Sequence, residues 1–337
     1  MVKRFVAVFA VLALAVLVMP SSSFAVFEEL VKHPARSPEP YKQYANKAPY
    51  DRVAPAPDVL VDYLRLDNKL NGYPEVPKAA SADKAFLQDV KDAVRELPKP
   101  VQAQLSKHLA GIFLVRELGT TSLTEVLTVP ANEQKGFIVL DVDFISKPVN
   151  EWASLRANSP FAPDGRAEIK AVLEEPENDN RKAAIQYILI HQIGHLVGAA
   201  IGAFPSWNKD EPAENFAFSR ISWKTVNGKP VSKFDDEFTM RPKIKFYSLA
   251  DSSIPAVKIP ECYEQLRQTD FASLYASRNV WSDFAGAYSV YVHTVLQKKP
   301  WIMEIYTDGV KTGAFPSPLF GERGMAKVQF LENLFKQ

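Results

Sequence analysis

The feature that most constrains the fold is a long apolar segment, RKAAIQYILIHQIGHLVGAAIGAF, at residues 181–204. It has no proline, and nearly every position after the basic pair at its start is apolar. A helix that is apolar on all sides is buried in a large core or in a membrane. Gly194, Gly198 and Gly202 recur every fourth residue, so they share one side of such a helix. We therefore predict one buried helix, with a second segment packed closely against its glycines.

The same segment has the length of a membrane span, and its glycine spacing also occurs in paired membrane helices. His191, Gln192 and His195 would then lie near the centre of the bilayer, where polar groups are costly. Basic residues flank only one end of the segment. We therefore expect a helix buried in protein, and no membrane span in the mature chain.

His191 and His195 are spaced as metal ligands are. Residues four apart lie one turn apart on one helix face, so both rings can reach one zinc ion. In the H-E-x-x-H pattern, the glutamate after the first histidine takes a proton from the zinc-bound water. Gln192 stands at that position, and a neutral amide is no base near neutral pH. The loss of a general base costs about 10²–10⁴ in rate. Two ordinary core histidines, satisfied by hydrogen bonds, are the alternative interpretation.

Elsewhere the chain alternates between strand-like and helix-like segments. The amphipathic spacing in 82–97 predicts a helix, 99–118 predicts a helix that runs into a strand, and 136–145 predicts a buried strand. Asn227-Gly228 lies between two alternating segments and predicts a hairpin. Residues 269–296 predict a loop and then another apolar helix. Strands precede the histidine helix and a more helical half follows it, so the fold class is α+β with a mixed sheet.

The first 25 residues have the features of a signal peptide. A basic start, an apolar stretch and small residues at Ser23 and Ala25 predict cleavage before Val26 and a periplasmic or secreted protein. Six prolines in 34–57 predict a leader over 26–58, without helix or central strand, that either wraps the domain or stays mobile. Residues 59–337 then form the main domain, with an amino-terminal half to about 204 and a carboxy-terminal half over 205–337.

Composition excludes some classes of partner. Forty basic residues balance 39 acidic ones, a net charge of +1, so nothing predicts binding to nucleic acid. Cys262 is the single cysteine, so the chain has no internal disulfide. An exported chain without a disulfide is typical of a bacterial periplasm or exterior.

HQIGH, followed much later by YASRNVWSDFAGAYSVYV, resembles the zincin metallopeptidases whose third zinc ligand is a glutamate, and the lethal-factor-like members most of all. The resemblance covers about residues 100–296. It implies that His191 and His195 are zinc ligands, that Gln192 replaces the general base, and that Tyr275 stabilises an oxyanion. Aligned on the D-F-A core, the ligand glutamate is replaced by Ser282 and a second glutamate by Gly286.

A second alignment compares NVWSDFAG with the E-x-x-x-D helix of thermolysin-like members. It makes Asp283 a carboxylate that supports the ligands, and it puts Asn279 at the ligand position. Both alignments lack the ligand glutamate. A slip of one residue would let Asp283 bind the metal as a shorter carboxylate.

The resemblance therefore implies a zincin-like fold that has lost its catalytic machinery. Our first hypothesis is an exported pseudopeptidase that binds a peptide, a protein or a cell-wall fragment in the former active-site cleft, with zinc bound weakly or absent. A second is an active zinc peptidase with an atypical site, using Asp283 or Tyr275 as ligand. A third is a structural envelope protein without a metal.

Overall fold

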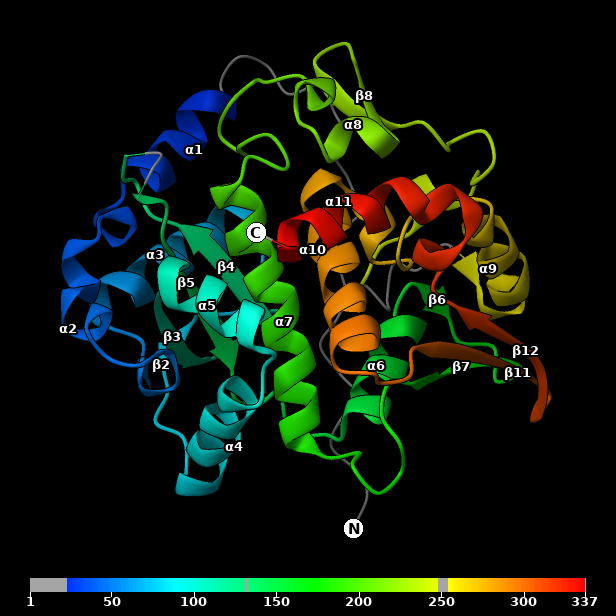
Figure 1. Ribbon diagram of the computed structural model, residues 1–337, viewed down its shortest axis with the longest axis horizontal. Helices are drawn as coiled ribbons and strands as arrows, with labels where there is room; N and C mark the ends of the chain where they lie inside the picture. Colours follow the sequence, from blue (N-terminus) through cyan, green and yellow to red (C-terminus); the bar gives the residue numbers. More distant parts are fainter. Residues whose placement is uncertain (1–22, 131–132, 248–253, 337) are drawn as a thin grey trace.

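The computed structural model describes residues 23–130, 133–247 and 254–336. Residues 1–22 of the predicted signal peptide lie outside this range. The chain forms an α+β fold, as predicted, with a mixed sheet on one side of a central helix pair and a smaller antiparallel sheet on the other (Figure 1).

The main sheet has five strands. Strands β1 (Val53–Pro55), β3 (Leu109–Arg116) and β5 (Gly136–Asp141) are parallel neighbours. Strand β2 (Lys78–Ala79) pairs with β3, and β4 (Ser122–Val126) pairs with β5; both pairs are antiparallel. Because β3 and β5 are apolar at nearly every position and buried throughout except at Arg116, both faces of the sheet must be covered.

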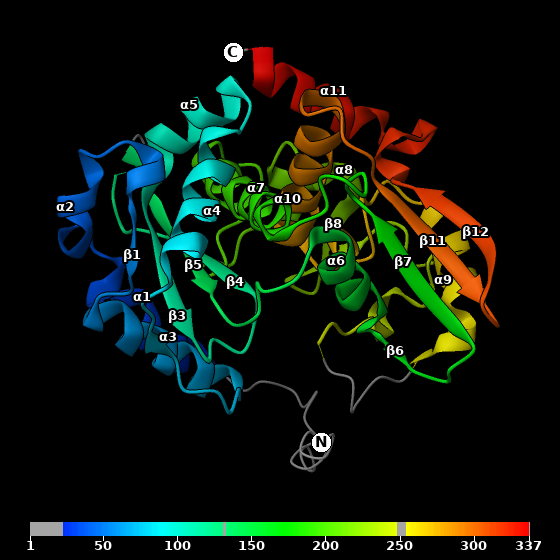
Figure 2. The ribbon, with the colours of Figure 1, turned by 90° about the horizontal axis from the view of Figure 1, so that it is seen from below.

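Alternate side chains of β3 serve the two faces. Ile112 and Leu114 belong to the large core beneath helices α4 (Lys84–Arg95), α5 (Lys99–His108) and α7 (Arg181–Ala200). Phe113 and Val115 belong to a smaller core on the opposite face. Helices α1 (Ser23–Lys32), α2 (Lys42–Ala45) and α3 (Asp58–Asn71) lie on this second face (Figure 2).

The leader wraps the domain, the first of the two predicted possibilities. Tyr41 is buried against Phe113 and Phe137, and its hydroxyl donates a hydrogen bond to the Ala35 carbonyl. Strand β1 is at the edge of the sheet, where proline is tolerated. The four-residue helix α2 and short 3-10 turns at 34–36, 39–41 and 49–51 contradict our expectation of no helix, because prolines at the starts of these turns need no amide partner. Most of the leader packs on the face of the sheet away from α7, whereas Tyr50 packs on the other face, against Arg95 of α4.

A second sheet has three antiparallel strands in the order β12 (Val310–Pro316), β11 (Ile302–Thr307) and β7 (Ala167–Val172), so it combines strands from both predicted halves of the domain. Asn227 and Gly228 both have positive φ, which confirms the predicted hairpin of β8 (Trp223–Val226) and β9 (Lys229–Ser232). The remaining elements are α6 (Val149–Asn158), β6 (Phe161–Ala162), α8 (Ser219–Ser222), β10 (Ile254–Pro255), α9 (Ile259–Arg267), α10 (Val280–Tyr291), a π-helical turn over 292–296 and α11 (Met325–Lys336).

Helices α7 and α10 lie side by side through the middle of the molecule (Figures 1 and 2). A Cβ added at Gly194 would stand 2.9 Å from the Ala285 Cα, so glycine permits this close contact, as predicted. The predicted helix over 181–204 ends earlier, at Ala200, and Gly202 lies beyond it with positive φ and no close neighbour to an added Cβ. One apolar core continues across both helices and joins the two halves. Within the described part of the chain, no helix combines the length and the apolar content that crossing a membrane requires.

Candidate functional site

Helix α7 carries the two histidines on one face, as predicted. Asn180 caps its start, because the side-chain oxygen accepts a hydrogen bond from the Ala183 amide. The His191 and His195 ring centroids are 5.0 Å apart and the rings are nearly perpendicular. Tyr187 lies one turn before His191 on the same face. The helix thus presents a row of three ring side chains to the segment around Tyr275.

Both histidines are neutral at pH 7. Burial, repulsion between the two imidazoles if both were protonated, and the positive charges of Arg156 and Arg278 lower the pKa of His191 well below its usual value. Burial and Arg156 lower the pKa of His195 to about 4. The His191 ring hydrogen-bonds to the backbone of Ala285, while its buried Nε2 has no hydrogen-bond partner among the described residues. A buried nitrogen without a partner is costly, so this atom indicates a ligand position.

Gln192 is hydrogen-bonded through both ends of its amide. Its Nε2 donates to the Ser122 hydroxyl at 2.6 Å, and its Oε1 accepts from the Thr124 hydroxyl at 2.6 Å. Both hydroxyls belong to β4, the antiparallel edge strand beside α7. The side chain at the general-base position therefore links the helix to the sheet.

Tyr275 lies beside the histidine pair, where the resemblance predicts it. Its ring centroid is 5.6 Å from that of His191. Two guanidinium groups stack on the same tyrosine ring, that of Arg156 at 3.7 Å and that of Arg278 at 4.7 Å from the centroid. Tyr275 therefore brings two cations close to His191.

Asp283 is not brought to the histidines as a free carboxylate. It is fully buried and accepts hydrogen bonds from Trp223 Nε1 at 2.9 Å and from Lys327 Nζ at 2.6 Å. Lys327, also fully buried, makes a second ion pair with Asp270 at 2.9 Å. Burial raises the pKa of Asp283 to about 6 although Lys327 opposes this rise. These contacts make Asp283 part of an ion cluster that holds helix α11.

The residues that the two alignments place at ligand positions on α10 have structural contacts. Asn279 is its N-cap, and its Oδ1 accepts a hydrogen bond from the Ser282 amide at 2.8 Å. Gly286 faces Ala276, since a Cβ added there would stand 2.7 Å from the alanine methyl. Ser282 is buried, on the same side of α10 as Gly286.

These residues do not fit a catalytic zinc site. Such a site needs three protein ligands. Across residues 23–130, 133–247 and 254–336, no three histidine, cysteine, aspartate or glutamate side chains are grouped to hold a metal. His191 and His195 supply two nitrogens, and the nearby Arg156 and Arg278 disfavour a further cation. The donor set thus falls short by one carboxylate.

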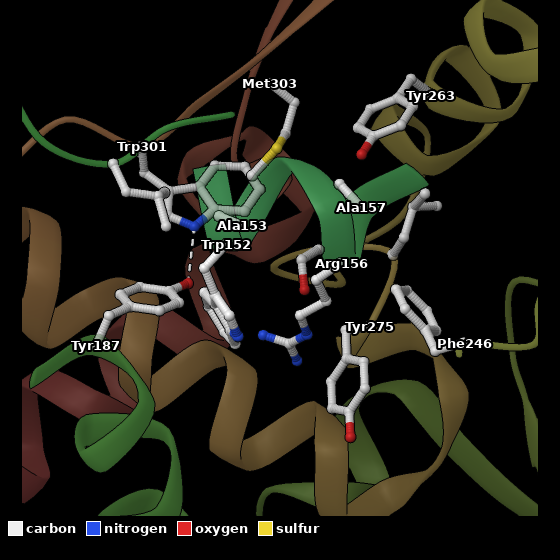
Figure 3. Close-up of a pocket in the computed structure, with 13 residues that line it drawn as sticks. Trp152, Ala153, Arg156, Ala157, Tyr187, Phe246, Tyr263, Tyr275, Trp301 and Met303 are labelled. Atoms are coloured by element: carbon white, nitrogen blue, oxygen red, sulfur yellow. Dashed lines mark hydrogen bonds between the residues drawn. The ribbon is translucent and has the colours of Figure 1, made fainter. Parts of the chain in front are cut away.

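A cavity of about 40 Å³ opens beside this group (Figure 3). Arg156 reaches into it from α6, and Tyr187 and Tyr275 form two of its walls. The remaining walls are mostly apolar or aromatic, and they include Trp152, Phe246, Trp301 and Met303. The cavity is therefore an apolar pocket with one guanidinium inside it.

Four residues of this site were not predicted from the sequence. Arg278 stands in the quoted YASR stretch beside Tyr275, so it could have been noticed. Arg156, Ser122 and Thr124 have no local signal, because only the fold brings them near α7. Comparisons with family models, with curated proteins and with solved structures found no match for the chain.

Proposed function

We propose that the protein is an exported, zincin-like pseudopeptidase that binds a peptide, a protein or a cell-wall fragment without cleaving it. The observation that carries the proposal is the pair of hydrogen bonds made by Gln192. Its amide is used by Ser122 and Thr124, so the position that would activate water in a peptidase serves here as a link between α7 and β4.

The arrangement of the elements supports a zincin-like ancestry. A mixed sheet ends in an antiparallel strand, β4, and the histidine helix lies against that strand. The second motif segment follows as α10, packed along α7, with Tyr275 beside His191. The order of these parts along the chain and the contact between Tyr275 and His191 support the proposal.

The edge strand supports a peptide-like ligand. Within the described residues, β4 pairs with β5 on one side only, and its side chains are mostly half-buried. The Val126 amide donates to Glu125 and its carbonyl accepts from Arg36, so a ligand would pair with the earlier residues of the strand. Such an edge can accept an extended peptide through backbone hydrogen bonds. A ligand lying there would pass the histidine face of α7.

Peptide hydrolysis tests the proposal. The purified protein should cleave a broad peptide library no faster than its His191→Ala variant. Gln192→Glu alone should restore little activity, because the third ligand is still absent. Gln192→Glu combined with Ser282→Glu should raise zinc affinity first and activity second.

Combining Gln192→Glu with Asn279→Glu instead tests the thermolysin-like alignment, at the expense of the α10 cap. Chelator-sensitive cleavage by the unmodified protein would refute the pseudopeptidase proposal and favour the atypical peptidase, with Tyr275 as the nearest additional ligand.

Ligand binding separates a binding protein from a structural envelope protein. Protein purified from its native host without chelator is first assayed for zinc, and peptide binding is then measured by calorimetry. No metal and no affinity for any peptide or cell-wall fragment would favour the structural alternative. Affinity without cleavage is the result that we expect.

A further inference from the structure

The pocket beside the histidines contains a cation for which the described residues provide no anion. Arg156 makes no ion pair there, and its buried Nε has no hydrogen-bond partner. Its guanidinium lies between the rings of Trp152, at 5.3 Å, and Tyr275, at 3.7 Å (Figure 3). Stacking leaves the edge of a guanidinium able to donate hydrogen bonds in its plane.

Two other partly buried arginines of this chain have carboxylate partners, while buried Arg52 donates to backbone carbonyls. Arg241 forms an ion pair with Asp235, and Arg181 forms one with Asp89. A desolvated charge usually has such a partner. The absence of one for Arg156 among the described residues indicates a position where the anion is supplied by a ligand.

A second arginine points to the same ligand chemistry. The Arg278 guanidinium also stacks on the ring of Tyr275, 4.7 Å from the ring centroid. Tyr275 itself lies 5.6 Å from His191 between ring centroids, so both charges are close to the histidine with the unpartnered Nε2. Two cations around one phenol ring create a positive field that favours an anion.

The pocket also limits the size and polarity of that anion. Its volume of about 40 Å³ and its walls of Trp152, Tyr187, Trp301 and Met303 fit a small group with one apolar side. A planar carboxylate matches the fork of a guanidinium with two hydrogen bonds. A small terminal residue of a peptide combines a carboxylate with a short apolar side chain.

We infer that Arg156 and Arg278 form a subsite for the terminal carboxylate of a peptide that ends in a small residue such as alanine. This inference rests on the proposed function, since it names the ligand class of the same cleft. Half-buried Arg156 supplies the hydrogen bonds, and the exposed Arg278 supplies positive charge on the other side of Tyr275.

Calorimetry with two matched peptides tests the subsite. The probes are acetyl-Lys-Ala-Ala as the free acid and as the carboxamide. The wild-type protein should bind the acid at least tenfold more tightly than the amide. Arg156→Met should abolish this preference, Arg156→Lys should keep part of it, and Arg278→Gln should reduce it.

Arg95→Met is the matched control, because Arg95 also stacks on a tyrosine, Tyr50, at 4.3 Å, but on α4 and outside the pocket. It should leave the preference unchanged. Near-UV circular dichroism checks that each variant is folded.

The outcomes separate this inference from the proposed function. Equal binding of acid and amide overturns the carboxylate subsite but leaves the pseudopeptidase proposal intact. Cleavage of the peptide overturns the pseudopeptidase, while an acid preference that depends on Arg156 would still support the subsite. Binding of neither peptide, or tighter binding of inorganic phosphate than of the free acid, overturns the carboxylate subsite.

Discussion

The buried cluster of Lys327, Asp283 and Asp270 allows a sharp test of how the last helix is held. The Lys327 ammonium lies 2.6 Å from Asp283 and 2.9 Å from Asp270, and all three side chains are buried. The Ser222 hydroxyl and Trp223 Nε1 donate to the two carboxylates. Lys327→Met would remove the cation and leave two carboxylates facing each other without water.

The expected loss is large. Removing one partner of a buried ion pair costs about 3–5 kcal/mol of unfolding free energy. In the variant, protonation of the Asp283 carboxylate can relieve part of this cost. Burial already holds the pKa of Asp283 at about 6 with Lys327 present, and without Lys327 this pKa rises further. A carboxyl group with a higher pKa in the folded than in the unfolded state lowers the unfolding free energy. This loss is full at pH values above the folded-state pKa and shrinks as the pH falls below it. The loss should therefore be greatest at pH 8 and clearly smaller at pH 5.

Urea denaturation followed by far-UV circular dichroism at both pH values measures this loss. Lys336→Met is the control, because Lys336 is on the same helix in an exposed pair with Glu332, and such pairs contribute about 0–1 kcal/mol. Replacing Asp283 and Asp270 by asparagine together with Lys327→Met should recover most of the stability. A Lys327→Met loss that matches the control, or that does not vary with pH, would refute the argument.

Two further stability predictions follow from the helix pair. Gly194→Ala places a methyl 2.9 Å from the Ala285 Cα, so α7 and α10 must separate. We expect urea denaturation to show a loss of about 1–3 kcal/mol in unfolding free energy. An unchanged denaturation midpoint would contradict this close contact. Burial lowers the pKa of His293 to about 4, so the folded state excludes a proton that the unfolded chain takes up below pH 6.5. The unfolding free energy is therefore highest above pH 6.5, and up to about 3 kcal/mol of it is lost as the pH falls to 4. His293→Gln should reduce the dependence of unfolding free energy on pH in this interval, and an equal slope in both proteins would count against the prediction.

Local periodicity explains which parts of the molecule could be predicted from sequence. The face shared by His191 and His195, the hairpin at Asn227-Gly228 and the buried strand β5 all depend on residues close together in the chain. The close contact at Gly194 was also predictable, because a glycine in an apolar helix has few other uses.

Long-range partners could not be predicted in the same way. Gln192 bonds to Ser122 and Thr124, about 70 residues earlier, and only the position of β4 decides this. The D-F-A motif made Asp283 a candidate metal ligand, yet its actual partner, Lys327, lies 44 residues later in the chain. The motif alone therefore could not predict that this carboxylate forms an ion pair.

The common core of the two halves has a consequence for the kinetics of ligand exchange. With α7 and α10 in contact at Gly194 and Ala285, a hinge motion between these two helices would break that contact. We therefore expect the two helices to keep their packing when a ligand binds, so that the entropy lost comes mainly from the ligand. Association should then be a single fast step whose rate depends on salt through Arg156 and Arg278, rather than on a slow rearrangement of the fold.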